Sequence, residues 1–275
     1  MSVKNFIPQI WSARLLANLD KNFVYASCVN RDYEGEIKQL GDTVKINKLG
    51  DITIKDYTGA DIDAPQDVTS TQVSLTIDQG KYFNFSVKDV DQAQSNVSLV
   101  DKYSDRAGVA IGDVIDQYIA SFVKEAGIKV GSASAAKTIT ISNAYDTLVD
   151  LKVALNKKNV PKQGRFVCLP PEYVGLLEKD PRFTKDTSVL ANGYVGNVAG
   201  FMVKESNNVP FATDKYSILA GTEMAIAFAG QVTEIEAYRP EKNFSDAVKG
   251  LYTYGAKVVE PNAIACLTAT ITVAA

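Results

Sequence analysis

Apolar residues recur at helical spacing in several stretches of the chain. The longest run predicts a helix over residues 97–126, which Gly127 ends and which is about 45 Å long at 1.5 Å per residue. A second amphipathic helix is predicted over residues 8–29 and a short one near 173–177. A third is predicted over 143–158, with an apolar stripe of Ala144, Leu148, Leu151 and Leu155. The two longest patterns rest on Trp11, Leu15, Leu19 and Phe23, and on Val100, Tyr103, Ala107, Ile111, Val114, Tyr118 and Phe122.

Between residues 50 and 96 the spacing changes to the alternation of β-strands. Short alternating runs flank a turn-rich centre at residues 59–65, and we interpret the region as a long two-stranded ribbon with a tip. An isolated two-stranded ribbon is only marginally stable. We therefore expect it to lie on another surface, which could belong to another subunit. The alternating positions are Ile52 and Ile54, then Val73, Leu75 and Ile77, then Phe83, Phe85 and Val87.

The remainder of the chain is dominated by further short strand patterns. With two main helices and many strands that do not alternate regularly with helices, the fold class is α+β. Residues 35–48 predict a strand pair or one bent strand. The other predicted strands cover residues 137–141, 166–169, 200–204, 216–220, 225–229, 232–239, 249–259 and 263–273.

Charge is nearly balanced overall but is segregated along the chain. The 275 residues carry 29 Lys and Arg against 32 Asp and Glu, a formal net charge of −3, which lacks the basic surplus of a typical nucleic-acid reader. Residues 1–31 nevertheless sum to +3 and residues 50–91 to −5. The predicted N-terminal helix is thus basic and the predicted ribbon acidic.

Candidate catalytic and metal chemistry is sparse. The chain contains no histidine, which excludes Ser-His-Asp, Cys-His and His-zinc sites. Ser121 and Lys124 form an S-x-x-K pattern without its companion S-D-N and K-T-G motifs, so a serine hydrolase is a remote alternative. Asp61 and Asp63 offer oxygen ligands but are too few for a metal site. We predict no catalytic, metal or cofactor site.

The three cysteines, Cys28, Cys168 and Cys266, are too widely spaced for a C-x-x-C motif. We expect them to be buried free thiols of a protein that folds in a reducing compartment. No secretory signal opens the chain, and the longest uncharged stretch, residues 261–275, is too short and too strand-like for a membrane helix. Folding in the cytoplasm and no membrane association are therefore expected.

The order of these parts resembles the major capsid protein of tailed bacteriophages, with the Hong Kong 97 type fold. The likeness covers essentially the whole chain, in the branch whose chains begin directly with the N-terminal arm. No one motif is specific, and the order and spacing carry the resemblance. The residues concerned are Ile7–Trp11 with Leu15 and Leu16, Gly41–Lys45, Asn159–Pro161 with Gly164 and Arg165, Leu169–Pro171, Gly200–Val203, Ser206–Pro210, Tyr254–Val258, and Glu260 with Pro261.

The resemblance implies a division of the chain into the parts of that fold. These are an N-arm (1–32), an extended two-stranded E-loop with flanking strands (33–96), a peripheral domain with the spine helix (97–135), an axial domain (136–229) and returning strands of both domains (230–275). The intersubunit contacts expected in the N-arm and E-loop are Trp11, Arg14, Lys21, Lys55, Asp56, Tyr57, Asp61, Asp63 and Asp67.

It also implies an icosahedral shell of hexamers and pentamers that self-assembles around double-stranded DNA without sequence-specific binding. The N-arm pattern begins almost at Met1, so we expect a separate scaffolding protein, together with a portal protein and a decoration protein. The virion is the expected location, after assembly in the host bacterial cytoplasm. Some family members crosslink covalently through an E-loop lysine, for which Lys55 and Lys81 are candidates by location alone.

Two other functions remain open at this stage. An encapsulin-like bacterial nanocompartment would share the fold and enclose a cargo enzyme in place of a genome. The contents of the shell, or the neighbouring genes, distinguish it from a phage capsid. The serine hydrolase alternative requires measurable ester hydrolysis that is lost on Ser121→Ala.

Overall fold

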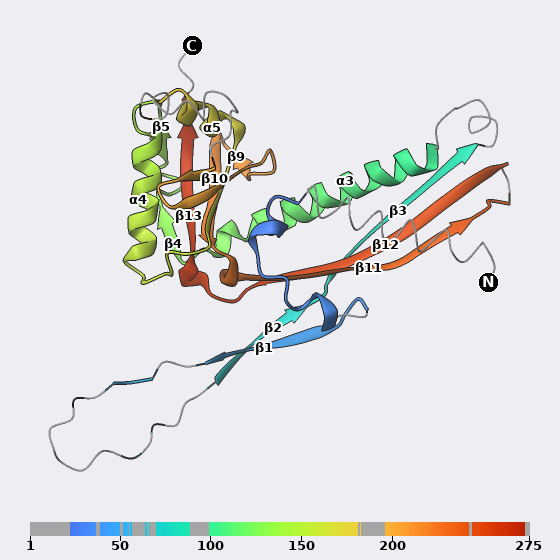
Figure 1. Ribbon diagram of the computed structural model, residues 1–275, viewed down its shortest axis with the longest axis horizontal. Coiled ribbons are helices and arrows are strands. Elements are labelled where there is room, and N and C mark those ends of the chain that lie inside the picture. Colours follow the sequence, from blue (N-terminus) through green and yellow to red (C-terminus); the bar gives the residue numbers. More distant parts are fainter. Residues whose placement is uncertain are drawn as a thin grey trace.

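The computed structural model describes residues 23–36, 39–49, 52–54, 56, 64, 66, 70–88, 99–180, 182, 196–241 and 244–272. In these residues the chain forms two main sheets backed by helices and a separate two-stranded ribbon that points away from them (Figure 1). The mixture of helices with largely antiparallel sheets confirms the predicted α+β class.

The larger body is an eight-stranded sheet with the order β4-β13-β10-β6-β8-β7, to which β5 and β9 add at β13 and β10. All five residues of the central strand β6 are buried, and helix α4 covers the sheet with Leu148, Leu151 and Leu155, which are fully buried. The predicted stripe of α4 is thereby confirmed. The elements are β4 (Ile128–Val130), β5 (Lys137–Ile139), α4 (Ala144–Asn156), β6 (Arg165–Leu169), α5 (Pro171–Glu178), β7 (Asn197–Val198), β8 (Phe201–Glu205), β9 (Phe211–Ala212), β10 (Lys215–Thr222), η4 (Glu223–Ala225), η5 (Pro261–Ala263) and β13 (Ile264–Ile271).

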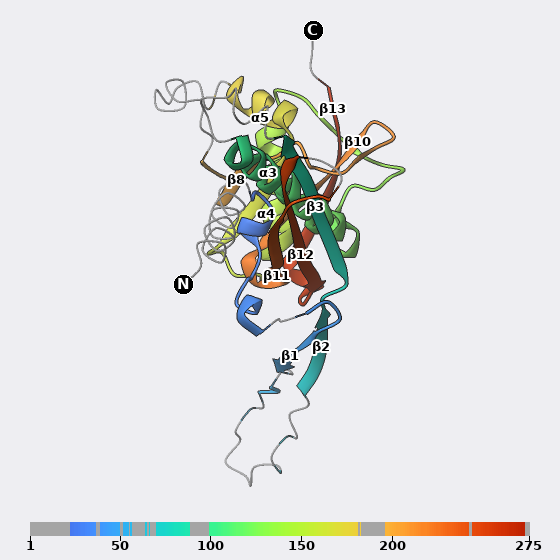
Figure 2. The same ribbon diagram turned by 90° about the vertical axis from the view of Figure 1, so that its right-hand side faces the viewer.

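The second body is a long three-stranded antiparallel sheet with the order β11-β12-β3. Its strands are β3 (Gln79–Lys88), β11 (Ile226–Tyr238) and β12 (Ser245–Val258). The spine helix α3 (Leu99–Ser121) runs beside this sheet and continues into η3 (Phe122–Glu125) (Figures 1 and 2). The rings of Phe85 and Tyr103, 5.7 Å apart, pack the edge strand against the helix.

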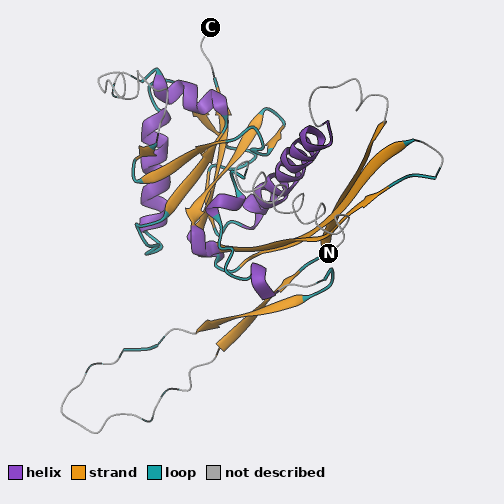
Figure 3. Cartoon of the chain, turned by 45° about the vertical axis from the view of Figure 1, so that its right-hand side comes forward, coloured by secondary structure: helices purple, strands orange, loops and turns teal. Residues whose placement is uncertain are grey.

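The ribbon consists of β1 (Thr43–Leu49) and β2 (Ser70–Thr76), paired antiparallel from Thr43 opposite Thr76 to Leu49 opposite Ser70. It points away from both sheets in two views of the chain (Figures 1 and 3). Strands were predicted at both places, but the ribbon was predicted within residues 50–96, whereas its first strand, β1, lies before residue 50. N-terminal to the ribbon lie η1 (Ala26–Cys28) and η2 (Glu34–Glu36).

Several predicted elements are corrected by the structure. The third alternating run, Phe83 to Val87, was assigned to the ribbon but pairs as β3 with β12. The last residues of the helix predicted over 8–29 instead form bends and the single 3₁₀ turn η1, while residues 8–22 lie outside the described part. The two strands predicted at 225–229 and 232–239 are one strand, β11, with a bulge between Val232 and Glu234.

Candidate assembly surfaces

The base of the ribbon has its own small hydrophobic core. Val44 and Ile46 of β1 and Leu75 and Ile77 at the end of β2 pack on Ala227 and Ala229 of β11, apart from the main core. Small residues on β11 let the two ribbon strands approach closely. The ribbon is therefore anchored at one end and carries no further core of described residues along its length.

A glycine on β12 makes this close crossing possible. A Cβ added at Gly255 would lie 2.2 Å from the carbonyl oxygen of Thr76 and 3.0 Å from the Cα of Ile77. Both are backbone atoms, which cannot move aside without moving the ribbon. Gly255 is thus the point at which any larger side chain would push the ribbon off the sheet.

An ion pair and a cleft lie beside the ribbon base. The ammonium group of Lys48 on β1 pairs with the carboxylate of Glu260, in the connection between β12 and β13. The cleft next to this pair measures about 570 Å³ and separates the ribbon from the loop after α4. Its lining comprises Lys48, Thr71, Val73, Lys158, Asn159, Val160, Pro161, Val259, Glu260, Asn262 and Ala263.

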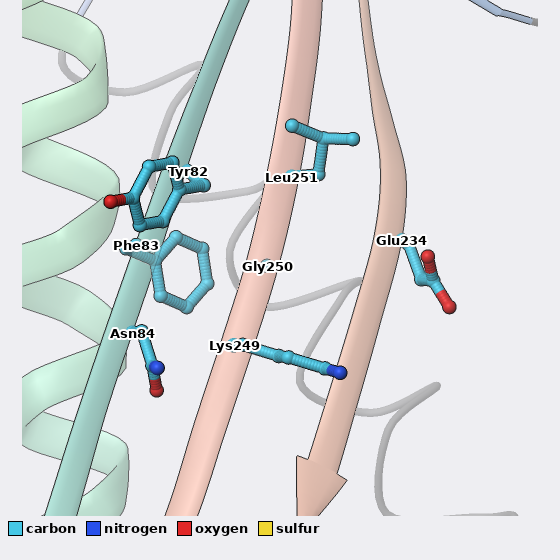
Figure 4. A pocket seen from close by; sticks show the side chains of 7 residues that line it. All are labelled: Tyr82, Phe83, Asn84, Glu234, Lys249, Gly250 and Leu251. Carbon is cyan, nitrogen blue, oxygen red and sulfur yellow. The ribbon is translucent and has the colours of Figure 1, made fainter.

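The three-stranded sheet exposes a mixed aromatic and charged face. Tyr82 is 80% exposed although it lies in mid-strand, and the ammonium group of Lys249 pairs with the carboxylate of Glu236 at 2.7 Å. A shallow cavity of about 390 Å³ opens here, and Figure 4 shows the side chains of three neighbouring strands around it. Its lining comprises Tyr82, Phe83, Asn84, Glu234, Lys249, Gly250 and Leu251.

Such a surface is suited to contact with another protein. An exposed aromatic ring beside charged groups is typical of interface residues, which combine apolar area with polar orientation. The exposed Tyr82 was not singled out from the sequence, because in an alternating strand it reads as one outward-facing position among others. The feature of the sequence that could have revealed it is an aromatic residue at a position where the strand alternation predicts a polar side chain.

One buried carboxylate of the spine helix binds the backbone of the N-terminal segment at residues 24–26. Asp116, 1% exposed, accepts backbone N–H hydrogen bonds from Val24 at 2.8 Å, Tyr25 at 3.0 Å and Ala26 at 3.1 Å. Burial raises its pKa to about 6, only partly opposed by these three donors, and the nearby carboxylate of Asp113 adds to the rise. Asp116 therefore holds the backbone of residues 24–26 on the spine helix.

Asp116 was missed from the sequence. The feature that could have revealed it is an acidic residue on the apolar side of the predicted helix. It lies next to Ile115 and four residues before Ala120, both of which are fully buried. A charged residue at such a position requires partners, because an unpaired buried charge is costly. The partners came from a segment about 90 residues earlier, which helical periodicity does not reveal.

Most of the contact residues expected in the N-arm and E-loop lie outside the described residues. Of that set the structure describes only Asp56, which is exposed. Lys81, a candidate for covalent crosslinking by its place in the E-loop, is exposed on β3 opposite Tyr252, in the three-stranded sheet and not in the ribbon. The residues outside are Trp11, Arg14, Lys21, Lys55, Tyr57, Asp61, Asp63 and Asp67.

The S-x-x-K pattern lies at the end of the spine helix. The hydroxyl of Ser121 donates a 2.6 Å hydrogen bond to the carbonyl of Tyr118, one turn earlier. Ser121 and Lys124 border a shallow polar depression of about 340 Å³ with the loop at residues 207–210. Ser121 thus engages the helix backbone, a common arrangement of serine in helices.

The described residues show neither a metal-binding cluster nor a membrane-spanning helix. They contain no cluster of three or more acidic or thiol side chains placed to hold a metal ion. Within the same residues, no helix is long and apolar enough to cross a membrane.

The family comparison covers most of the chain. A model of the phage capsid protein family matches residues 70–267. A chain from Mycobacterium phage Che8 is 30% identical, with a TM-score of 0.73 over 89% of this chain and 90% of that one. A search of curated proteins found no match.

Two more distant structures share the fold at lower identity. The capsid of Cyanophage P-SCSP1u matches with a TM-score of 0.71 at 16% identity, over 91% of this chain and 89% of that one. A virus-like particle from Pyrococcus furiosus matches with a TM-score of 0.60 at 13% identity, over 94% of this chain and 97% of that one. At these identities the likeness concerns the fold alone.

The helix-backed sheets, the spine helix and the projecting ribbon, together with these matches, define a shell protein of the Hong Kong 97 type. The chain belongs to the phage capsid protein family. It is a major capsid protein, a structural and non-enzymatic component that oligomerises into the shell of the virion. This confirms the capsid prediction, and the encapsulin alternative is not better supported.

Proposed function

We propose that copies of this chain close into an icosahedral shell of hexamers and pentamers, held together by the N-arm, the E-loop and the exposed face around Tyr82. The observation that carries the proposal is the ribbon, whose described residues form a hydrophobic cluster at its base alone, on Ala227 and Ala229. A two-stranded element with so little core of its own gains stability by lying on a neighbouring copy. Many such contacts, each weak, add up once the shell closes.

Charge supports a particular pairing between copies. The first 31 residues sum to +3, and residues 50–69, which connect the two ribbon strands, carry five Asp against one Lys and sum to −4, so the N-arm of one copy attracts the E-loop of the next. Each exposed ion pair contributes at most about 1 kcal/mol. The effect on assembly comes from repeating the pairs around every capsomer.

Reversing the charge of the N-arm should therefore impair assembly without unfolding the chain. We expect Arg14→Glu combined with Lys21→Glu to lower the yield of shells severalfold at low salt, because attraction becomes repulsion between neighbours. Light scattering measures the yield. Adding Asp61→Lys and Asp63→Lys should restore it, whereas reversing the exposed Lys157 and Lys162 serves as a matched control of equal charge. Shells formed in wild-type yield by the doubly reversed arm would contradict the pairing.

The proposed content of the shell is double-stranded DNA, held without sequence recognition. A net charge of −3 suits a wall that confines DNA without binding it tightly, because a strongly basic lining would bind phosphate. A scaffolding protein, a portal protein and a decoration protein are the further partners we propose, and the host bacterial cytoplasm is the proposed place of assembly.

The direct test is light scattering with negative-stain imaging of the purified full chain, alone and with the scaffolding protein encoded beside it. We expect closed megadalton shells in at least one condition. Shells that package DNA in the presence of the portal agree with the proposal, and shells that instead retain a cargo enzyme favour the nanocompartment. A persistent monomer in both conditions would contradict self-assembly through these surfaces.

A further inference from the structure

The sequence around the loop after α4 is basic throughout. Residues 151–171 contain five Lys and Arg and no Asp or Glu, whereas the whole chain carries a net charge of −3. Four of these five cations lie within residues 157–165, which connect the end of α4 to the start of β6 and which we call the basic loop. They are Lys157, Lys158, Lys162 and Arg165. The nearly balanced total charge therefore includes one concentrated positive segment.

The basic loop presents its lysines to solvent without partners. Lys157, Lys158 and Lys162 are exposed, and none of them forms an ion pair with another described residue. The side-chain amides of Asn159 and Gln163, which are also exposed, add further hydrogen-bond donors. Lys158 and Asn159 line the cleft of about 570 Å³ beside the ribbon base as well. The loop therefore exposes cationic and amide donors and no carboxylate.

Arg165 holds the backbone of the basic loop in place. This residue is 4% exposed, and its guanidinium donates from Nε to the carbonyl oxygen of Pro161 at 2.7 Å and from Nη2 to that of Val160 at 2.6 Å. The backbone N–H of Val160 in turn donates to the carbonyl oxygen of Leu155 in α4, at 3.3 Å. A loop that is fixed in this way loses little conformational freedom when it binds a partner.

The end of α4 accounts for only part of this positive charge. Cations beside a helix C-terminus are stabilised by the partial negative charge of its last carbonyl groups, which is a sufficient reason for Lys157 and Lys158 directly after Asn156. Lys162 lies six residues beyond the helix, where this effect has fallen off. The helix also gives no reason for the absence of every acidic residue from 151–171. The remaining charge is available to an anion from outside the chain.

The chemistry of the basic loop favours a phosphate backbone over an acidic protein surface. Protein interfaces are depleted in lysine and enriched in aromatic residues, and the basic loop contains no aromatic residue. Contacts to the phosphates of nucleic acids come from Lys, Arg and amide side chains of the kind that this loop exposes. We propose that the basic loop binds the phosphate backbone of double-stranded DNA without reading its sequence.

This contact deepens the proposed function, because it rests on DNA being the content of the shell. Three exposed lysines per copy make each contact weak and dependent on salt. Repetition of the contact in every copy of a shell adds the weak contacts together along one DNA molecule. A wall that is acidic overall then touches DNA at one defined place per copy and leaves it free elsewhere.

The test measures the fluorescence anisotropy of a short labelled DNA duplex mixed with the full chain before assembly. Three lysine–phosphate contacts predict that a tenfold rise in salt lowers the association constant roughly 500-fold, a logarithmic slope of about −2.7. Lys157→Gln, Lys158→Gln and Lys162→Gln together should weaken binding at low salt by about tenfold or more and remove most of the salt dependence. The thermal unfolding midpoint should stay at the wild-type value, because all three side chains are exposed.

The matched control combines Lys81→Gln, Lys102→Gln and Lys124→Gln, which remove the same charge at three exposed positions outside the basic loop. It should bind the duplex within about twofold of the wild type. Lysine footprinting of the wild type needs no variant. An amine-reactive ester should modify the three lysines of the basic loop severalfold more slowly when the duplex is present, as mass spectrometry of peptides measures.

Three outcomes would overturn the proposal. They are equal affinities of the two triple variants for the duplex, protection of lysines only outside the basic loop, and tighter binding of poly-glutamate than of the duplex, which would identify an acidic protein as the partner. Lys157 and Lys162 also serve as control positions for shell yield. Loss of duplex binding with shells in full yield therefore agrees with the inference, and loss of shells with duplex binding retained contradicts the assembly proposal alone.

Discussion

Asp116→Ala is expected to lower the free energy of unfolding at pH 7 by about 3 kcal/mol, because it leaves three backbone N–H groups of the N-terminal segment without their acceptor. The loss should be accompanied by faster proteolysis before residue 30 and by poorer shell assembly, since the N-arm then leaves the body in no fixed direction. Denaturant unfolding, limited proteolysis and light scattering measure the three effects. Lys102→Ala, at an exposed position of the same helix, is the control with little expected change.

The pH dependence of stability distinguishes this carboxylate from an ordinary acceptor. Its pKa is raised from 3.8 to about 6 in the folded chain, so the folded state binds the proton more tightly than the unfolded state does. The part of its contribution to stability that comes from binding this proton is therefore full below about pH 4 and is lost as the pH rises through 6, a change on the order of 2–3 kcal/mol. The ionised carboxylate still accepts its three backbone hydrogen bonds at pH 7. Asp116→Asn replaces the titrating carboxyl group by an amide, so the variant lacks this pH dependence of the unfolding free energy. The difference in unfolding free energy between wild type and this variant should fall by that amount from pH 4 to pH 7, and a constant difference would contradict the assignment.

The helices of the body could be predicted because their stability follows from local periodicity. The stripe of Leu148, Leu151 and Leu155 in α4 is buried as expected, and α3 begins and ends within a few residues of its predicted limits. The end of the helix predicted over residues 8–29 differs from the prediction. Val24, Tyr25 and Ala26 direct their N–H groups to Asp116, and this tertiary acceptor competes with helical hydrogen bonding there.

Strand partners were harder to predict than the strands themselves. Alternation predicted Phe83 to Val87 as a strand, but a two-residue period carries no information on which strand lies alongside, and its partner β12 is more than 150 residues later. Strand β4, only three residues long, was missed, because such a run is too short for a pattern and is stabilised by pairing in parallel with β13.

The assembly surfaces could be predicted only as regions. Opposite charge marked the N-arm and the E-loop, because charge is visible in the sequence without a fold. The ribbon base depends on Gly255 approaching Thr76, a contact between backbones 179 residues apart in the sequence, for which the glycine alone offers no signal. The cleft at Lys48 and Lys158 likewise exists only once the ribbon and the loop after α4 are placed side by side.

Gly255→Ala should separate the ribbon from the sheet and abolish assembly. The added Cβ would meet the carbonyl oxygen of Thr76 at 2.2 Å, so the ribbon base must shift and lose its packing on Ala227 and Ala229, at a cost of about 2–4 kcal/mol. Thermal unfolding measures the loss, proteolysis within residues 43–76 reports the detached ribbon, and light scattering reports the missing shells.

Gly175→Ala provides the matched control for this change. Gly175 lies in helix α5 with nothing within 4 Å of its added Cβ, so the same substitution should stabilise the chain by about 0.5–1 kcal/mol and leave assembly intact. Comparing Gly255→Ala with Gly175→Ala tests whether the loss of assembly depends on the position of the glycine, because the substitution is the same in both variants. If Gly255→Ala assembled like wild type while its ribbon remained resistant to protease, the ribbon base would not be the rigid anchor that orients the E-loop toward a neighbouring copy. Failure of assembly with an intact unfolding midpoint would show instead that orientation, more than folding stability, limits the shell.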